Sequence, residues 1–373
     1  MSDIGLYVHV PFCHRICPYC SFYKHLPGGI DHGRFVQALI AEAKRAVDED
    51  GLVPETIYFG GGTPTALSPA HWEALLEGFS NVLDLKQVKE WTVEANPMTM
   101  GTKKNRLLRQ GGVTRISLGV QAWEPEVLKV LGRDHSPEEA EETFHELRAE
   151  GFPHVNLDLM FSVPSQNEAL WRESLEKTIA LGPDHISAYN LTYEEDTEFL
   201  AQFKAGKFSQ SEDENAGQFY LADELLEAAG FEHYEISNYA KPGHHSRHNQ
   251  AYWFGADYVG LGPGAVSTVR GTRRNNIRDT ALYMALIERG GDTATERETL
   301  THDAVRMERV ALELRTQRGL ATRWLEDTGD WQKKLVALAD EGFLLAPESG
   351  MEYVRLNKNG LAVADAIAEY LLP

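Results

Sequence analysis

The N-terminal region reads Gly5-Leu-Tyr-Val-His-Val-Pro-Phe-Cys13-His-Arg-Ile-Cys17-Pro-Tyr-Cys20, and this stretch decides the fold. Its first part, Leu6–Val10, is an apolar run typical of a buried strand, and the only three cysteines among 373 residues follow directly. Iron–sulfur clusters of the four-iron type normally take four thiolates. The spacing therefore predicts a [4Fe–4S] cluster held by Cys13, Cys17 and Cys20, with one iron left open to bind a small molecule.

Two other uses of these thiols are weighed against the cluster. A structural zinc site could add His14 or His25 as a fourth ligand, but such sites usually pair two short ligand loops, and the chain offers no second loop of this kind. A disulfide would leave one thiol unpaired, and nothing else in the sequence indicates export. The cluster is the preferred interpretation.

The composition is that of an ordinary globular protein, with 42% hydrophobic and 25% charged residues. The net charge is −20, from 56 acidic against 36 basic residues. This excess of negative charge repels phosphate groups, so it argues against an exposed phosphate-binding face and against nucleic acid as a partner. The sequence offers neither a secretory signal nor an apolar stretch long enough to span a membrane. A cytoplasmic protein is expected, in which thiols stay reduced and can bind metal.

Short apolar strands alternate with amphipathic helices along the first half of the chain, a pattern that favours a parallel α/β sheet with right-handed crossovers. Six such units can be counted, so the expected fold is an open, partial (β/α)6 barrel of the TIM-like kind rather than a closed eight-unit barrel. The predicted strands are 5–10, 56–59, 91–95, 115–120, 154–161 and 185–191, and the predicted helices are 35–48, 72–83, 126–131, 139–150 and 170–181.

The remaining chain divides into two further parts. We expect the barrel to occupy residues 1–235, and a region rich in His and aromatic residues, 236–291, to pack on it through loops and short strands. Residues 292–373 contain expected helices at 304–318 and 332–341, short strands at 342–345 and 353–356, and a last helix from residue 361. This order predicts a small winged-helix-like C-terminal domain, and the acidic composition favours a packing or cover role over DNA binding.

Polar residues follow the expected strands, and barrel sites collect at the C-terminal ends of strands. The second strand ends in Gly-Gly-Gly-Thr-Pro (60–64), where the absence of side chains would let backbone amide and carbonyl groups grip a ligand. Glu94 follows the third strand and could bind ribose hydroxyls, and Gln121 follows the fourth. Asp158 lies within an otherwise apolar strand, where burial is costly without a partner, and Arg133 is the expected partner.

Together, the cysteine motif and the Gly-Gly-Gly-Thr-Pro motif resemble those of the radical S-adenosylmethionine (SAM) enzymes, specifically the oxygen-independent coproporphyrinogen III oxidase group. The resemblance runs over nearly the full chain. In this group the open iron chelates the amino and carboxylate groups of SAM, and the reduced cluster cleaves the sulfonium bond to give a 5′-deoxyadenosyl radical. The resemblance further implies that Tyr7 and Tyr19 flank the cofactor. It also assigns Gly61, Gly62 and Thr63 to the methionine part, Glu94 to the ribose, and Gln121, Arg133 and Asp158 to the rest of the nucleotide pocket.

Two departures point to one branch of the group. The decarboxylases carry a further Cys two residues after the third ligand, where this chain has Phe22, and they have a longer segment before the first strand. Both features resemble the haem-chaperone branch. So does His248-Asn-Gln-Ala-Tyr-Trp253, which resembles the H-N-x-x-Y-W motif associated with haem binding there. Imidazole is the commonest protein ligand of haem iron, so His248 is the expected ligand, with Arg247 available to a propionate.

Two positions depart from the group's usual pattern. Ser162 stands where a Gly is more usual, which puts the shape of that turn in question, and Val266 stands where a His is common. The second change removes one candidate iron ligand and gives more weight to His248, with His244 and His245 as alternatives.

The resemblance therefore predicts a haem chaperone that binds haem as cargo and passes it to an acceptor protein, such as a respiratory one. Whether SAM is turned over remains open. The rival functions are oxidative decarboxylation of coproporphyrinogen III, which Phe22 argues against, radical ring opening of haem, and modification of RNA or protein. The sequence also leaves open the acceptor, the oligomeric state and a transient contact of the C-terminal domain with a membrane.

Overall fold

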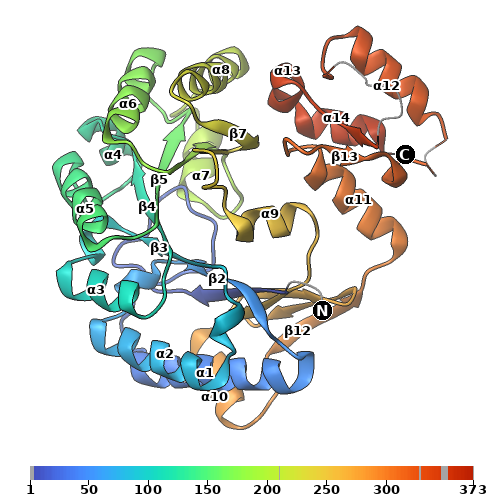
Figure 1. The fold of residues 1–373 in the computed structure, drawn as a ribbon. Coiled ribbons are helices and arrows are strands. Elements are labelled where there is room, and N and C mark those ends of the chain that lie inside the picture. The colour runs from blue at the N-terminus through green and yellow to red at the C-terminus, as the bar shows by residue number, and fades with distance from the viewer. Residues whose placement is uncertain (1–3, 210, 327–328, 346–351, 373) are drawn as a thin grey trace.

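A large sheet organises the computed structural model, which describes residues 4–209, 211–326, 329–345 and 352–372. Within these ranges the sheet has 12 strands in the order β12-β11-β10-β9-β1-β2-β3-β4-β5-β6-β8-β7. Strands β1 to β6 follow one another in space as they do in sequence, and each is parallel to the next. The sheet curves without closing, and its two edges are formed by β12 and β7. This α/β architecture is the open partial barrel that the sequence predicts (Figure 1).

All six predicted strands are present with small differences in their ends. They are β1 (Ile4–Val10), β2 (Pro54–Gly61), β3 (Glu90–Ala95), β4 (Arg115–Gln121), β5 (His154–Phe161) and β6 (His185–Asn190). The helices that connect them are α1 (His32–Asp50), α2 (Pro69–Val82), α3 (Thr102–Gln110), α4 (Pro125–Val130), α5 (Pro137–Glu150) and α6 (Glu168–Leu181), with short 3-10 turns η1 (Pro64–Ala66), η2 (Leu85–Gln87) and η3 (Pro97–Thr99). Helix α3 was not among the predicted helices, because most of its residues are polar.

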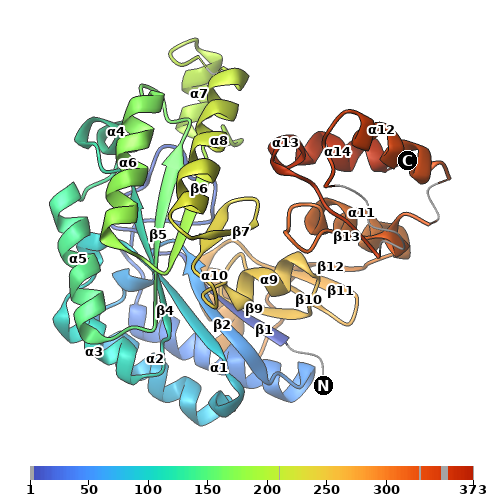
Figure 2. The same cartoon turned by 45° about the horizontal axis from the view of Figure 1, so that its top comes forward.

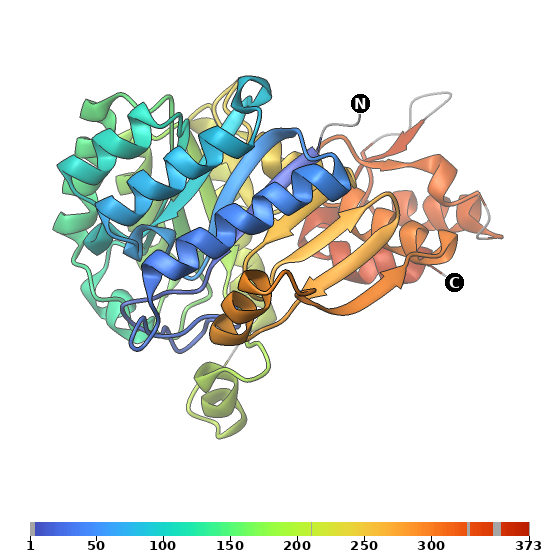
Figure 3. The ribbon, with the colours of Figure 1, turned by 90° about the horizontal axis from the view of Figure 1, so that it is seen from below.

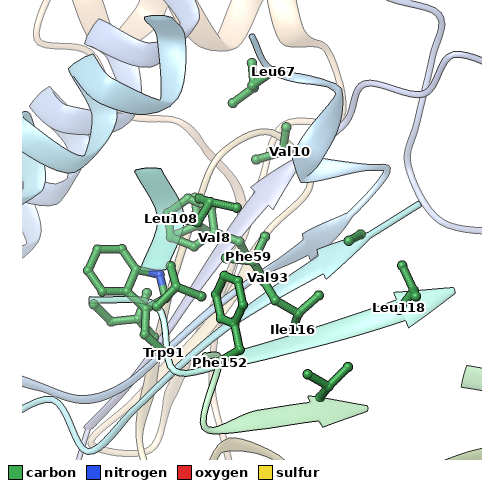
Figure 4. Close-up of a cluster of buried hydrophobic side chains, with 14 of the residues drawn as sticks. Val8, Val10, Phe59, Leu67, Trp91, Val93, Leu108, Ile116, Leu118 and Phe152 are labelled. Atoms are coloured by element: carbon green, nitrogen blue, oxygen red, sulfur yellow. The ribbon is translucent and has the colours of Figure 1, made fainter. Parts of the chain in front are cut away.

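The strands alternate between two faces, as a period of two residues requires. One face packs against the helices and is apolar: Val8, Phe59, Val93 and Ile116 are fully buried there. Figure 4 shows these side chains gathered with Leu108 of α3 and Trp91 of β3 in a continuous core. The neighbouring residues along each strand point to the inside of the barrel and are largely polar, which makes the interior a site rather than a second core.

Strands beyond the predicted six extend the sheet on both sides. On one side β9 (Tyr258–Leu261) pairs in parallel with β1, and β10 (Val266–Val269), β11 (Thr272–Asn276) and β12 (Ala294–Thr299) continue the sheet antiparallel. On the other side β8 (Asn238–Ala240) pairs antiparallel with β6, and β7 (Glu232–Glu235) follows. The helices of this part are α7 (Glu198–Lys204), α8 (Glu212–Ala228), α9 (Arg247–Trp253) and α10 (Thr280–Glu288). Seen from below, α7 projects from the body of the barrel (Figure 3).

The C-terminal part has a core of its own, in which Val310, Leu314, Leu320, Leu338 and Ile367 are buried. Its elements are α11 (His302–Glu313), β13 (Leu320–Ala321), η4 (Thr322–Trp324), α12 (Trp331–Asp340), β14 (Tyr353–Val354), α13 (Lys358–Ala362) and α14 (Ala364–Leu371). The predicted strand at 353–356 pairs with β13, which the sequence analysis had assigned to no strand, and Leu344 forms only an isolated bridge to Leu356. Helices with a small two-stranded sheet make up this unit.

The C-terminal unit lies beside the barrel, next to α9 (Figures 1 and 2). Backbone hydrogen bonds tie it to the barrel's edge strand, from Ile236 N to Arg315 O (2.8 Å) and from Gln317 N to Tyr234 O (3.0 Å). Strand β12 still belongs to the large sheet, so the second core begins after residue 300. Within the described ranges, none of the helices combines the length and apolar character needed to cross a bilayer.

Candidate functional site

A cavity of about 370 Å³ lies inside the barrel at the C-terminal ends of β1 to β5. The three cysteines line it, together with a side chain or turn from each strand end that the sequence analysis singled out. These residues are Cys13, Cys17, Cys20, Tyr19, Gly61, Gly62, Thr63, Glu94, Gln121, Arg133 and Asp158. The cysteines come from the loop after β1, which folds over the cavity, and parallel strands bring the other residues to the same edge because their carboxyl ends coincide.

Hydrogen bonds hold the cysteine loop in place. Cys13 N donates to His25 O (3.0 Å), and His25 N donates back to Pro11 O (2.8 Å). The Thr63 hydroxyl donates to Cys13 Sγ (3.6 Å), and the Lys24 ammonium donates to Cys20 O (2.5 Å). Burial raises the pKa of the Cys13 thiol to about 11 and also raises that of Cys20. Bound iron would reverse this effect, since a coordinating cation deprotonates a thiol.

The donor set fits a cluster better than a zinc ion. His25 has both ring nitrogens engaged elsewhere, Nδ1 with Leu26 O (2.8 Å) and Nε2 with Thr280 Oγ1 (2.8 Å), so it is not available as a fourth ligand. Among the described residues, no group of three or more His, Cys, Asp or Glu side chains could hold a single metal ion. A four-iron cluster does not require its thiolates to converge on one ion. Each thiolate binds its own iron, so the cysteine sulfur atoms stay apart.

The glycine turn after β2 approaches the cysteine loop closely. Gly61 has a φ of 102°, which disfavours other residues, and a Cβ at Gly62 would lie 2.7 Å from the backbone carbon of Pro11. The expectation that the turn offers free amide donors is wrong at two positions: Gly62 N donates to Val10 O (2.9 Å) and Thr63 N to Phe12 O (2.7 Å). The packing of the two loops uses these donors, so a ligand cannot take them.

Two carboxyl groups face the cavity, Glu94 from β3 and Asp158 from β5, the strands on either side of β4. Burial raises the pKa of Glu94 to about 7, against the opposing effect of a hydrogen bond from the Tyr58 hydroxyl (2.8 Å). Burial raises the pKa of Asp158 to about 6, although Ser117 Oγ (3.1 Å) and Asn156 Nδ2 (2.7 Å) donate to it. Each carboxyl is therefore held by neutral donors, and the charge of Asp158 adds to the rise in the pKa of Glu94.

Arg133 is not the ion-pair partner of Asp158 that the sequence predicted. Its guanidinium donates instead to Gly119 O (2.8 Å) and reaches Cys17 Sγ (3.8 Å), while its charge still lowers the pKa of Asp158 from a greater distance. Its Nε is buried and has no partner among the described residues. Gln121, at the end of β4, has a φ of 70°, and such strained backbone often marks a functional site. An unsatisfied donor and a strained strand end both suit a polar ligand.

A second cavity of about 730 Å³ adjoins the first and shares Phe22, Tyr58 and Tyr189 with it. It holds the two remaining predicted site residues, Tyr7 and His248. Tyr7 therefore lies beside the first cavity rather than on its wall, with its hydroxyl 3.1 Å from His9 Nδ1. Aromatic rings of Tyr252, Trp253 and Tyr258 also line this second space.

His248 is almost fully buried at the start of α9, with its ring stacked on that of Tyr58 (centroids 5.0 Å apart). Its Nδ1 lies 2.8 Å from Thr56 Oγ1, while its Nε2 has no hydrogen-bond partner among the described residues. Burial lowers the pKa of His248 to about 4, against the opposing charge of Glu90. The ring is therefore neutral at pH 7, and its Nε2 is a buried nitrogen whose hydrogen-bonding capacity is unused among the described residues.

The alternative histidines are not among the described residues that line the second cavity. His244 Nδ1 is 2.9 Å from the Nδ1 of His154, at the start of β5, and His245 Nε2 is 2.6 Å from Glu232 Oε2. The side chain of Arg247 is exposed and is not among the described residues that line the second cavity. These three residues lie within four positions of His248 in the sequence. The turn into α9 nevertheless directs their side chains away from the described lining of the second cavity.

The two departures from the group's pattern are accommodated. Ser162 has a φ of 61°, the conformation that a Gly would adopt without strain, and its amide donates to Gln218 Oε1 (2.7 Å). Val266 lines the second cavity and adds apolar surface there. Sequence reasoning missed Tyr58 and Ser117, which hold the two carboxyl groups. The sequence could have indicated them only as hydroxyl side chains at positions of β2 and β4 that face the barrel interior.

The comparisons with known proteins agree with the fold and the first cavity. Residues 7–178 match the model described as the Radical SAM superfamily, the class of protein that a cysteine loop over a partial barrel defines. The structure of the coproporphyrinogen III oxidase HemN from Escherichia coli superposes with a TM-score of 0.82, covering 99% of this chain and 90% of that one at 22% identity. At this identity the likeness establishes the fold.

Two curated relatives align with all or nearly all of the chain. It is 35% identical over 376 aligned residues to the Heme chaperone HemW of Mycobacterium tuberculosis (strain ATCC 25618 / H37Rv), covering 100% of this chain and 95% of that protein. It is 32% identical to the Heme chaperone HemW of Bacillus subtilis (strain 168), covering 92% and 93%. The chain belongs to the HemW family within the radical SAM superfamily. Membership of the superfamily implies a [4Fe–4S] cluster and SAM.

Proposed function

We propose that this protein is a haem chaperone, which binds haem in the second cavity and passes it to an acceptor protein in the cytoplasm. One observation carries the proposal: a cavity of about 730 Å³, walled by aromatic rings, contains a buried neutral histidine with a free Nε2. Neutral imidazole is the commonest protein ligand of haem iron, and flat aromatic side chains suit a porphyrin face. The names of the relatives support the same cargo.

The first cavity is proposed as the site of the cluster and SAM. Cys13, Cys17 and Cys20 would each bind one iron, and the bound pair would supply one-electron chemistry for cleavage of the sulfonium bond. The turn at Gly61–Thr63, which lines this cavity beside the cysteines, would hold the methionine part. Glu94 would accept hydrogen bonds from the ribose.

The other residues of the first cavity would hold the rest of the cofactor. Arg133 has an unsatisfied Nε for a carboxylate or ring nitrogen, and Gln121 and Asp158 offer an amide and a carboxyl group. Tyr19 would lie against the cofactor as a flat wall. Tyr7, on the far side of Tyr58, would contact haem more closely than SAM.

A second candidate function is the oxidative decarboxylation of coproporphyrinogen III. The two cavities share Phe22, Tyr58 and Tyr189, which puts a ligand of the second cavity within reach of chemistry in the first and favours a reaction on a porphyrin. Against it, Phe22 stands where the decarboxylases have a further Cys, and its side chain is exposed at 67%. Anaerobic incubation with reductant, SAM and coproporphyrinogen III separates the two: formation of protoporphyrinogen would overturn the chaperone proposal.

The test of the proposal is a haem titration of the anaerobically reconstituted protein, with and without SAM. We expect a stoichiometric shift of the Soret band, which His248→Ala loses. His245→Ala is the matched control, because its ring contacts Glu232 and is not among the described residues that line the second cavity, and we expect it to bind haem like the wild type. An intact cluster spectrum and far-UV circular dichroism verify that each variant is folded. If folded His248→Ala gives the wild-type Soret shift and affinity, His248 is not the ligand.

A further inference from the structure

The second cavity has one cationic residue among the described residues that line it, Arg278. It follows β11, and its side chain lies over Gly264 and Tyr23 at the mouth of the cavity, with a Cβ at Gly264 placed 3.4 Å from Arg278 Cγ. The residue is exposed, so its guanidinium reaches both solvent and the cavity. Arginine side chains commonly cover apolar surface with their aliphatic stem while the charged group stays in water.

Arg278 lacks the partner that its neighbours have. Arg273 in β11 forms a paired hydrogen bond to Glu308 (2.6 and 2.9 Å), and Arg274 forms an ion pair with Asp50. Within the described residues, no hydrogen bond or ion pair engages the guanidinium of Arg278.

The cavity itself contains no free counter-ion. Glu235 is the only acidic residue among the described lining, and it is buried and held by Ser237 N (3.1 Å) and by Asn238 Nδ2. Burial also raises the pKa of Glu235, which disfavours its charge. The charge of Arg278 acts inside the cavity: after the larger effect of burial, it helps to lower the pKa of His9 to about 4.

Two further polar atoms of the lining are unsatisfied. Asn238 Oδ1 and His248 Nε2 are both buried without a hydrogen-bond partner among the described residues. The cavity therefore combines an aromatic middle, a free imidazole nitrogen deep inside and an unpaired guanidinium at its mouth. A flat apolar ligand with an acidic edge fits all three, with the acidic edge toward solvent.

We propose that Arg278 binds a peripheral carboxylate of the ligand in the second cavity, and so selects porphyrins with free carboxyl groups and sets which edge faces out. The proposal rests on the proposed function, since it takes haem as that ligand. Guanidinium and carboxylate form two parallel charge-assisted hydrogen bonds, which give geometric selection as well as affinity. Arg247, which the sequence analysis offered to a propionate, lies outside the cavity.

The experiment compares Arg278→Gln with Arg247→Gln, both exposed arginines, in titrations of the reconstituted protein with haem and with haem dimethyl ester. We expect Arg278→Gln to weaken haem binding about tenfold, equivalent to about 1.4 kcal/mol, and Arg247→Gln to leave it unchanged. Wild type should bind the ester about tenfold more weakly than haem, and Arg278→Gln should bind the two ligands equally. Arg278→Lys should recover part of the affinity for haem.

The outcomes separate this inference from the proposed function. If wild type binds haem and Arg278→Gln binds it equally well, the role of Arg278 is wrong and the haem site stands. If Arg278→Gln weakens haem and its ester by the same factor, the residue supports the structure of the cavity and does not bind a carboxylate. If wild type binds no haem, the proposed function fails, and the assignment of Arg278 fails with it.

Discussion

Replacement of Glu94 by Gln should make the cofactor-free protein more stable and its cofactor site weaker. Glu94 borders the first cavity, accepts a hydrogen bond from the Tyr58 hydroxyl at 2.8 Å, and faces a second buried carboxyl group at Asp158. Burial, with the charge of Asp158, raises its pKa from 4.5 to about 7. Folding therefore costs free energy wherever this carboxyl is ionised, and an amide of the same shape avoids that cost.

The magnitude follows from the pKa values. At about 1.4 kcal/mol per pKa unit, the difference between 4.5 and about 7 corresponds to about 3.4 kcal/mol. Water that enters the cavity screens the charge, so we expect about half, ~1.7 kcal/mol, in the measured free energy of unfolding.

The effect has a definite sign with pH. Between pH 4.5 and about 7 the folded protein holds a proton on Glu94 that the unfolded chain has lost, so stability falls as the pH rises through this window. The cost is complete above pH 7. The advantage of Glu94→Gln should therefore be small near pH 5 and reach its full value by pH 8.

Urea unfolding of cofactor-free protein between pH 5.5 and 8.5 measures this difference. Glu73→Gln is the control, because Glu73 is an exposed residue of α2, and it should change stability little at any pH. At pH 8.5, where Glu94 is ionised, Glu94→Gln should weaken SAM binding about tenfold, since the ribose would lose a charged acceptor. If Glu94→Gln is no more stable than wild type at pH 8.5, or if its advantage is the same at every pH, the carboxyl is not desolvated and the reasoning is wrong.

Three other predictions test the site. Replacement of any one of the three cysteines by Ser should abolish the visible absorbance of the reconstituted cluster, and retention of a full cluster in any of them would remove that residue from the ligand set. Gly62→Ala should destabilise the protein by about 1–3 kcal/mol, because its Cβ would lie 2.7 Å from Pro11 backbone. The control Gly217→Ala, in α8 with open space around it, should stabilise by about 0.4–1 kcal/mol in the same urea transitions. Haem affinity should stay constant from pH 8 to pH 6, since burial holds the pKa of His248 at about 4. A loss of affinity with a midpoint near 6.5, measured by titration, would instead indicate an exposed histidine ligand.

The strands of the barrel and the residues at their ends were open to prediction from sequence because both depend on local order. A strand buried between helices reads as a short apolar run, and a polar residue just beyond it comes to the rim of the sheet whatever the rest of the chain does. The cysteines, the glycine turn and Glu94 are of this kind. Eleven of the predicted site residues line one cavity for this reason.

Errors arose where contacts join segments far apart in the sequence. Arg133 was paired with Asp158 on charge alone, but the end of α4 turns it to Cys17 and Gly119. The glycine turn was expected to offer amides, but packing against the loop after β1 uses those of Gly62 and Thr63. Neither contact has a signal in the order of residues.

The second cavity belongs wholly to the tertiary structure. It forms because β9 pairs with β1, so that α9, β10 and the residues after β11 line a space together with β1 and β2. The motif from His248 to Trp253 could be read in the sequence, but the burial of that histidine and its free Nε2 could not. The sequence by itself determined the thiols and the barrel that presents them, since spacing and apolar runs act locally. Only the tertiary structure decided that Arg278, and not Arg247, stands at the cavity mouth, because pairing of distant strands sets which side chains meet.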